Sequence, residues 1–447
     1  MMGVKSFLGI ALSLLLCGGC RKEHDESVIF YQHPYPNNPE FATTLGTKLN
    51  ENAFAAAEVS AGLAVAGYTQ RAGAGGRDAL IALFDGAGNP LWCKVIGGLG
   101  DDVAHSITRT PDGGFAVAGW TSGRGGSDAL LARFDSSGNP LWAKTIGGTE
   151  DEAIREIASL GDGFVVAGLS RSEMSSKALL ARLDAGGNPV WAETIGGEEA
   201  YEARSVAVLP TGRIAICGIV GDYSNADINA FCAVFDTCGR FLWARALGDR
   251  GARLFDQAAR IIPGPGNTVI VSGDTRGFSS EGTDIFLFSL DSAGNLLWAK
   301  ALGGNDDDRS SSAVPVSGGF VLGGYTFSFG LRRCQTLISL FDSAGNRGWT
   351  YTAGWAGGDW CYGMTRTAGG FILVGRTWSF GAGGYDLLVL RFSPDHASDK
   401  ALISSQNPIL RDVEPSVVSL EPDVLPCALR VLEHDLKPRD LRPEPLK

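Results

Sequence analysis

Six near-copies of one eight-residue pattern, D-x-x-G-N-x-x-W, recur along the chain and constrain its fold more than any other feature. In each copy an aspartate stands three residues before a glycine and seven before a tryptophan. The aspartates are Asp85, Asp135, Asp184, Asp236, Asp291 and Asp342; the glycines are Gly88, Gly138, Gly187, Gly239, Gly294 and Gly345; the tryptophans are Trp92, Trp142, Trp191, Trp243, Trp298 and Trp349. Aspartate at the first position of a turn accepts a hydrogen bond from a backbone N–H two residues on, and glycine adopts the left-handed conformation that ends a type I turn. Because apolar runs flank each copy, the pattern predicts a tight β-hairpin.

A second landmark lies upstream of each hairpin: a short apolar strand that contains a small residue followed by glycine. These glycines are Gly67, Gly119, Gly168, Gly218, Gly273, Gly324 and Gly375, at steps of 49–55 residues. Each period holds four strands, which in the second repeat are "AHSITRT", "GFAVAGWT", "DALLARF" and "PLWAKTI". Four-stranded units at about this period are the signature of propeller blades. Their strands are apolar on both faces, as expected for sheets packed between neighbouring sheets.

The chain has seven glycine strands but only six tryptophan hairpins. After the seventh third strand, "YDLLVLRF", the glycine and tryptophan positions hold His396 and Lys400. The missing fourth strand is found near the N-terminus, where Phe41–Gly46 matches Trp142–Gly147 position for position. The sequence therefore predicts an all-β fold, a seven-bladed β-propeller over residues 39–394, with the N-terminal strand completing the last blade. Such closure leaves no open sheet edge within the ring.

The two ends of the chain differ in composition from the repeats. Lys5 precedes an apolar stretch, Ser6–Leu16, which is too short to span a bilayer and is typical of a secretory signal. The sequence "CGGC" then resembles a bacterial lipobox, so residues 1–19 are expected to be a signal peptide and Cys20 the lipidated residue, with residues 20–38 as a tether. The alternative is an ordinary secretory signal without a lipid. Residues 395–447 contain no glycine and many prolines, which predicts an extended tail with one short helix near Leu429–Leu436.

The hairpin motif resembles the tryptophan-docking motif of quinoprotein-like β-propellers. It is most similar to the repeats of bacterial secreted and lipoprotein propellers, "GGxxDD…DGGfivaGyT…D.nGn.lW.k..GG", most of which are uncharacterised. The resemblance covers about four fifths of the chain and implies the fold. It implies little about function, because propellers host many unrelated activities.

Acidic residues recur in the loops that join one blade to the next, and these are the first candidate site. They are Asp101, Asp102, Asp151, Glu152, Asp307, Asp308 and Asp359. On one face of the ring they would form a surface for a partner, or a calcium site. The alternative is that each carboxylate caps the N–H groups of its own loop. No calcium-loop motif is present, so we expect no metal.

The first strands should line the central channel, and their polar positions vary between repeats. His105, Arg155, Arg204 and Tyr362 are therefore candidate funnel residues. The alternative is a solvated funnel without a ligand. The six tryptophans are expected to be structural, packing between blades, rather than a carbohydrate-stacking set.

Catalytic and cofactor signals are absent from the sequence. His105 is the one histidine in a blade, which excludes a histidine metal cluster or repeated Ser-His-Asp arrangement within the ring. Seven cysteines follow Cys20, an odd number with no CxxC spacing, which is neither a disulfide framework nor a zinc site. No cofactor and no catalytic residue are expected. A carboxylate-pair hydrolase acting in the funnel stays open as a weaker alternative.

The net charge of −11, with no basic run, argues against nucleic acid and anionic membrane surfaces as partners. We therefore expect a lipid-anchored, non-enzymatic, monomeric propeller of the bacterial cell envelope, attached to the outer membrane or facing the periplasm or exterior. Its leading function is a protein-interaction scaffold for envelope proteins, by analogy with scaffold propeller lipoproteins of outer-membrane assembly. The alternative is a glycan-binding module of the envelope, for which Trp120 or Trp378 beside the loops would supply exposed aromatic rings.

Overall fold

The computed structural model describes most of the chain between residues 29 and 393, and short strands within 403–440. The described ranges are 29–33, 41–70, 75–123, 126–148, 150–172, 175–222, 227–248, 255–279, 281–330, 333–355, 357–393, 403–405, 409–412, 416–420, 423–426, 430–432 and 439–440. Cys20 and the predicted signal peptide lie outside them, as do His24, His396, His434 and Cys427.

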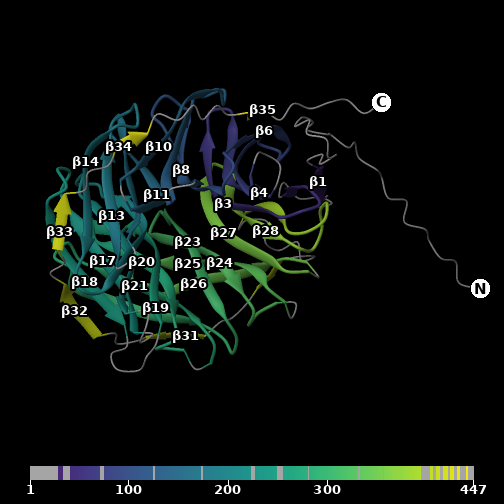
Figure 1. Cartoon of the computed structure of the whole chain (residues 1–447). Helices are drawn as coiled ribbons and strands as arrows, with labels where there is room; N and C mark the ends of the chain where they lie inside the picture. Colours follow the sequence, from purple (N-terminus) through teal and green to yellow (C-terminus); the bar gives the residue numbers. More distant parts are fainter. Residues whose placement is uncertain are drawn as a thin grey trace, which may run out of the picture.

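Seven antiparallel sheets form a ring, so the predicted all-β, seven-bladed propeller is confirmed (Figure 1). Blade 1 contains β3 (Glu51–Val59), β4 (Gly62–Gln70), β5 (Arg77–Phe84) and β6 (Pro90–Ile96). Blade 2 contains β7 (Asp102–Arg109), β8 (Phe115–Gly123), β9 (Gly126–Phe134) and β10 (Pro140–Gly147). Blade 3 contains β11 (Asp151–Leu160), β12 (Gly163–Arg171), β13 (Ser176–Leu183) and β14 (Pro189–Gly196).

The remaining blades repeat this order. Blade 4 contains β15 (Ala200–Val208), β16 (Ile214–Asp222), β17 (Asp227–Phe235) and β18 (Phe241–Gly248). Blade 5 contains β19 (Asp256–Pro263), β20 (Val269–Thr275), β21 (Asp284–Leu290) and β22 (Leu296–Gly303). Blade 6 contains β23 (Asp308–Val316), β24 (Gly319–Thr326), β25 (Gln335–Asp342) and β26 (Arg347–Ala353). Blade 7 contains β27 (Asp359–Thr367), β28 (Gly370–Thr377) and β29 (Asp386–Phe392).

The ring closes as the sequence predicts. Strand β2 (Ala42–Gly46) pairs antiparallel with β29, with Ala42 opposite Leu390 and Leu45 opposite Leu387. Residues from 42 to 46 are fully buried, and Leu45 packs in one apolar cluster with residues of blades 1 and 7. The N-terminal strand thus supplies the fourth strand of blade 7 and joins the two ends of the ring.

A fifth strand on the outer edge of every blade was not predicted. The segment after blade 7 runs round the ring in reverse order, pairing with one fourth strand after another. Its strands are β30 (Ile403–Ser405), β31 (Ile409–Asp412), β32 (Ser416–Leu420), β33 (Asp423–Pro426), β34 (Arg430–Leu432) and β35 (Arg439–Asp440), on blades 6 to 1 respectively. In Figure 1 the yellow arrows of this segment lie on the outer rim. Blade 7 receives β1 (Ile29–His33) instead, which pairs with β2.

These outer strands refine the expectations for the two ends of the chain. The expected helix near Leu429–Leu436 is wrong at Arg430–Leu432, which forms β34. Strand β1 lies inside the segment predicted to be a tether. The one helical element described is a short 3-10 turn, Pro265–Asn267, and no helix in the described part of the chain is long and apolar enough to cross a membrane.

The hairpins have the predicted geometry. In blade 2, Asp135 Oδ1 accepts the N–H groups of Ser137 and Asn139 at 2.9 and 2.8 Å, while the Asn139 amide donates to Oδ2 at 2.9 Å. Gly138 has φ +80°, a left-handed conformation that favours glycine. These hydrogen bonds, the Asn139 side chain first, hold the pKa of Asp135 below its usual value.

Five of the six hairpin tryptophans dock on the turn of the following blade, and the sixth, Trp349, contacts Phe392 of blade 7. A Cβ atom on Gly187 in blade 3 would lie 2.6 Å from Cη2 of Trp142 in blade 2, so that position must be glycine for the ring to pack there. Trp92 meets Gly138 in the same way, and Phe41 takes this place against Gly88 where the ring closes. The six rings are partly exposed rather than fully buried.

We expect Trp142→Ala to lower the free energy of unfolding by about 2–3 kcal/mol, less than a fully buried tryptophan would cost because one edge of the ring faces solvent. Leu141→Ala is the matched control, since Leu141 is 52% exposed and next in sequence; it should change stability by less than about 0.5 kcal/mol. Chemical denaturation of both variants measures the difference. Equal stabilities would contradict docking between blades.

Candidate functional site

The acidic loops between blades contain two kinds of carboxylate, and the first kind is buried. Asp102 accepts the N–H of Gly98 at 2.8 Å, and Glu152, Asp308 and Asp359 accept the corresponding N–H groups of their own loops at 2.7–2.9 Å. All four side chains are at most 1% exposed. Burial raises the pKa of each, against hydrogen bonds that lower it. These four residues therefore hold their loops in shape and contribute almost nothing to the outer surface, although Glu152 also lines a cavity described below.

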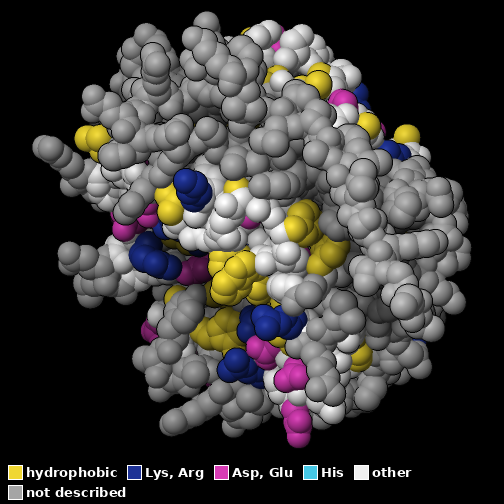
Figure 2. Space-filling view, turned by 90° about the vertical axis from the view of Figure 1, so that its right-hand side faces the viewer, with side chains coloured by type: hydrophobic (Ala, Val, Ile, Leu, Met, Phe, Trp, Pro, Cys, Tyr) yellow, Lys and Arg dark blue, Asp and Glu magenta, His cyan; other side chains and the backbone are white. Residues whose placement is uncertain are grey.

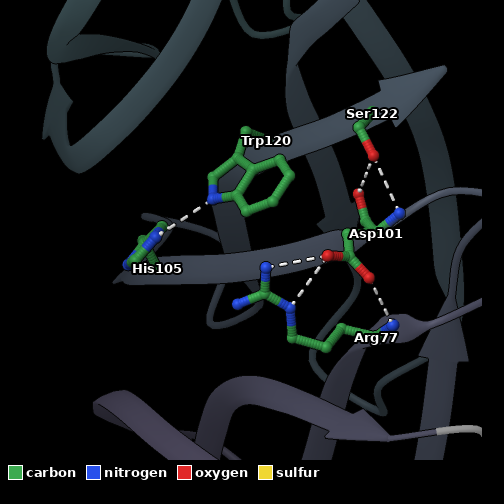
Figure 3. Close-up of polar contacts among 5 residues, drawn as sticks. All are labelled: Arg77, Asp101, His105, Trp120 and Ser122. Atoms are coloured by element: carbon green, nitrogen blue, oxygen red, sulfur yellow. Dashed lines mark hydrogen bonds and ion pairs between the residues drawn. The ribbon is translucent and has the colours of Figure 1, made fainter. Parts of the chain in front are cut away.

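The other three acidic residues reach the surface. Asp101 forms an ion pair with Arg77 at 2.8 Å and accepts the Arg77 backbone N–H at 2.8 Å (Figure 3). Its hydrogen bonds to Arg77 hold the pKa of Asp101 below its usual value. Asp151 accepts the N–H of Ser127 at 2.7 Å, and Asp307 lies 3.8 Å from Arg309. Among the described residues no group of three or more His, Cys, Asp or Glu side chains could hold a metal ion.

The funnel is built by a β-bulge that recurs in all seven first strands. At each bulge one residue has no register partner on the second strand. These residues are Phe54, His105, Arg155, Arg204, Ala259, Ser311 and Tyr362, and all of them line one cavity of about 370 Å³ at the centre of the ring. Bulges re-aim side chains, and here they turn one residue per blade into the funnel.

The repeated glycine of the second strand is explained by the same bulge. A Cβ atom on Gly119 would lie 1.8 Å from the carbonyl oxygen of Val103, which the bulge at His105 brings close. Gly67, Gly168 and Gly375 are equally close to carbonyl oxygens of their first strands. The funnel residue stands 13 or 14 positions before each of these glycines in the sequence. This spacing is the signal that would have identified Phe54, Ala259 and Ser311, which were not predicted.

The four funnel residues expected from the sequence come together in this cavity. A second cavity of about 340 Å³ adjoins it, and the two share Phe54, His105 and Arg155. Trp120 and Arg77 line the second cavity. The two cavities together form a continuous hollow next to the loops that join the blades.

His105 is held as a neutral imidazole. The Trp120 indole N–H donates to His105 Nε2 at 3.2 Å (Figure 3), and Arg155 Nη1 lies 3.0 Å from the same nitrogen. Both partners are donors, so Nε2 is the acceptor and the proton of the neutral ring is on Nδ1. Burial, together with the charges of Arg155 and Arg77, lowers the pKa of His105 to about 3. A histidine in this state does not serve as a general base near neutral pH.

Arginines dominate blades 3 to 6 around the funnel. Arg171 pairs with Glu202 at 2.8 Å, and Arg309 lies 3.5 Å from Asp274. Arg260 pairs with Glu156. Burial raises the pKa of Glu156 and of Asp274, while these arginines lower it. Arg204 donates instead to an uncharged group, the side-chain oxygen of Gln257.

Aromatic rings gather on blades 6, 7 and 1. The Arg376 guanidinium lies 4.7 Å from the ring centroid of Trp360 and 4.2 Å from that of Tyr385. Trp378 lies 5.3 Å from Tyr385 and is 61% exposed. Tyr362 contacts Phe54 and Tyr325, with centroids 5.9 and 6.1 Å apart. The funnel therefore has an aromatic side and a cationic side.

The similarity of this chain to known proteins is distant. No protein-family model and no curated relative matches the chain. Among solved structures, the WD40 β-propeller domain of Doa1 is 10% identical, with a TM-score of 0.46, and 78% of this chain and 95% of that chain are covered. Sqt1 from Chaetomium thermophilum is 15% identical, with a TM-score of 0.45 and coverage of 80% and 87%. The polysaccharide lyase Uly1 is 9% identical, with a TM-score of 0.45 and coverage of 85% and 97%.

The class that fold and site define is a seven-bladed β-propeller with a lined central funnel. At identities this low the likeness concerns the fold alone. The fold by itself does not separate a binding protein from an enzyme.

Proposed function

We propose that this protein is a glycan-binding module of the bacterial cell envelope, anchored through Cys20, whose ligand lies in the central funnel. The observation that carries the proposal is a row of contacts that links the surface to the funnel. The exposed Trp378 contacts Tyr385, the Arg376 guanidinium lies over the ring of Tyr385, and the same guanidinium lies 5.6 Å from the ring of Tyr362, which lines the funnel. Sugar rings present apolar faces that stack on aromatic side chains, while their hydroxyl groups bond to planar polar side chains. The hypothesis that the acidic loop residues form a surface for a protein partner is weakened, because four of the seven carboxylates are buried.

The test is a glycan array probed with the purified mature protein, followed by titration of the best ligand. We expect Trp378→Ala to weaken binding about tenfold, equivalent to about 1.4 kcal/mol. The matched control is Leu297→Ala, which removes a side chain of similar exposure, 54%, from the fourth strand of blade 5. Binding that is insensitive to Trp378, or an array without any ligand, would contradict the proposal.

A protein-interaction scaffold is the second candidate, and a specific observation favours it. The fourth strands begin with exposed aliphatic side chains at equivalent positions: Leu91, Leu141, Val190 and Leu297, each 51–57% exposed. Figure 2 shows one side of the molecule on which exposed hydrophobic side chains lie between basic and acidic ones. A protein partner that spans neighbouring blades would contact several of these exposed side chains at once. A pull-down from detergent-solubilised envelope, lost in a Leu91→Ser, Leu141→Ser double variant, would favour this function.

A hydrolase in the funnel requires two carboxyl groups that face a sugar from opposite sides. Glu156, Glu202 and Asp274 each lie against an arginine. Asp151 and Glu152, which line the adjoining cavity, accept the backbone N–H groups of Ser127 and Gly148. This arrangement favours binding over cleavage. Release of reducing ends from the glycan bound on the array would instead favour the hydrolase.

The anchor is tested separately. If Cys20 is lipidated, the mature protein partitions with membranes, and Cys20→Ala accumulates as an unprocessed precursor. Fractionation and mass spectrometry of the N-terminus measure both. Normal processing of the variant to a soluble form would mean an ordinary secretory signal and would leave the glycan proposal intact.

A further inference from the structure

We infer that the glycan is anionic: its carboxylate or sulfate groups meet the guanidinium groups of blades 3 to 5, while its sugar rings lie against the aromatic side chains of blades 6, 7 and 1. This inference rests on the proposed function and specifies the chemistry of the ligand. The two chemistries face one another across the same cavity, which Phe54 and Tyr362 line on one side and Arg204 and Arg260 on the other.

In three ion pairs around the funnel, on blades 3 to 6, the arginine is more exposed than the carboxylate, whereas Arg77 and Asp101 beside the second cavity are equally exposed, at 37% each. The Arg171 side chain is 53% exposed and its partner Glu202 is 9% exposed. For Arg260 and Glu156 the values are 32% and 6%. Arg309 is 28% exposed, against 3% for Asp274. Glu156 and Asp274 are therefore more buried than the arginines that they bind, and Arg260 and Arg204 reach the cavity directly.

Arg204 adds a charge that its hydrogen-bond partner does not cancel. Its guanidinium lies in the same cavity and bonds to the amide oxygen of Gln257, which is uncharged. This concentration of arginine stands against a net charge of −11 for the whole chain. Arginine binds carboxylate and sulfate groups through two parallel hydrogen bonds. A focused positive site on an acidic protein selects an anionic ligand over a neutral one.

A glycan fits this cavity better than an acidic peptide does. Glu202 lines the cavity beside the arginines and can accept a hydrogen bond from a sugar hydroxyl. The side chains of a run of aspartate or glutamate residues have no hydroxyl group to donate to this carboxylate. Phe54 and Tyr362 present ring surface to the cavity, which suits the apolar face of a sugar.

The experiment is calorimetric titration of the mature protein with oligogalacturonate and with hyaluronan oligosaccharides, each beside its carboxyl-reduced form. We expect carboxyl reduction to weaken binding at least tenfold, and a rise in NaCl from about 0.05 to 0.5 M to weaken binding of the charged forms only. Because the ligand is altered and the protein is not, this comparison does not depend on the folding of a variant. Poly-glutamate serves as the peptide probe.

Protein variants locate the effect. Arg204→Gln keeps a hydrogen-bonding side chain and should weaken charged oligosaccharides about tenfold at an unchanged melting temperature. The control is Arg366→Gln, which removes an exposed arginine near the C-terminal end of β27, beyond the funnel residue Tyr362. It should change affinity less than twofold. Equal affinity for native and carboxyl-reduced oligosaccharides would overturn the anionic inference and leave glycan binding standing. Binding of poly-glutamate without any glycan would overturn both.

Discussion

Deleting residues 39–47 will prevent the protein from forming a stable monomeric ring. The deletion removes β2, which pairs with β29 and with β1, and the buried side chains Ala42, Thr43, Thr44 and Leu45. It also removes Phe41, which docks on Gly88 of blade 1, and the Thr43 hydroxyl, which donates to the Gly88 carbonyl at 3.0 Å. The edge of β29 would then be open, and an open edge pairs with other chains.

Size-exclusion chromatography and thermal melting measured by circular dichroism are the readouts. We expect aggregates, or loss of a cooperative transition. The matched control deletes residues 21–27, which precede β1 and leave every described strand in place; it should stay monomeric with an unchanged melting temperature. A stable monomer lacking residues 39–47 would contradict closure through β2.

The second large effect is a fall in stability as the pH rises from about 4.5 to 7. Glu51 and Asp386 lie next to each other where blade 1 meets blade 7. Burial raises the pKa of Glu51 to about 7 and that of Asp386 to about 6, and the charge of Asp386 contributes to the shift of Glu51. The folded state therefore binds more protons than the unfolded chain between these pH values, so stability is highest below the unfolded pKa and is lost as the pH rises through the folded pKa. For Glu51 this loss in the free energy of unfolding is about 3 kcal/mol.

Glu51→Gln should flatten the dependence of the melting temperature on pH between 5 and 8, because glutamine does not titrate. Glu58→Gln is the control, since Glu58 is on the same strand and exposed; its profile should follow that of the unaltered protein. At lower pH, stability instead decreases as the pH falls. The hairpin aspartates, such as Asp135 and Asp291, have lowered pKa values, so the stability they contribute is lost as they are protonated. A profile that rises steadily to pH 8 would contradict the prediction.

The funnel was only partly predictable. The sequence placed His105, Arg155, Arg204 and Tyr362 at the channel because they vary between otherwise similar repeats. Phe54, Ala259 and Ser311 were missed, since an apolar or small residue at such a position looks like ordinary strand packing. The bulges that turn them inward are set by a close approach of two backbones, which shows in the sequence only as a glycine on the next strand.

The sequence by itself determined the number of blades, their hairpins and the closure of the ring. These depend on local chemistry that repeats, such as Asp135 capping its own turn and Gly138 adopting a left-handed conformation. Only the tertiary structure decided which loop carboxylates are buried and that the C-terminal segment adds a fifth strand to six blades. The burial of Asp102 depends on neighbouring strands that its own loop does not encode. The outer strands β30–β35 pair through backbone groups along edges that exist once the ring has formed, so no periodic pattern of side chains in the sequence predicts them.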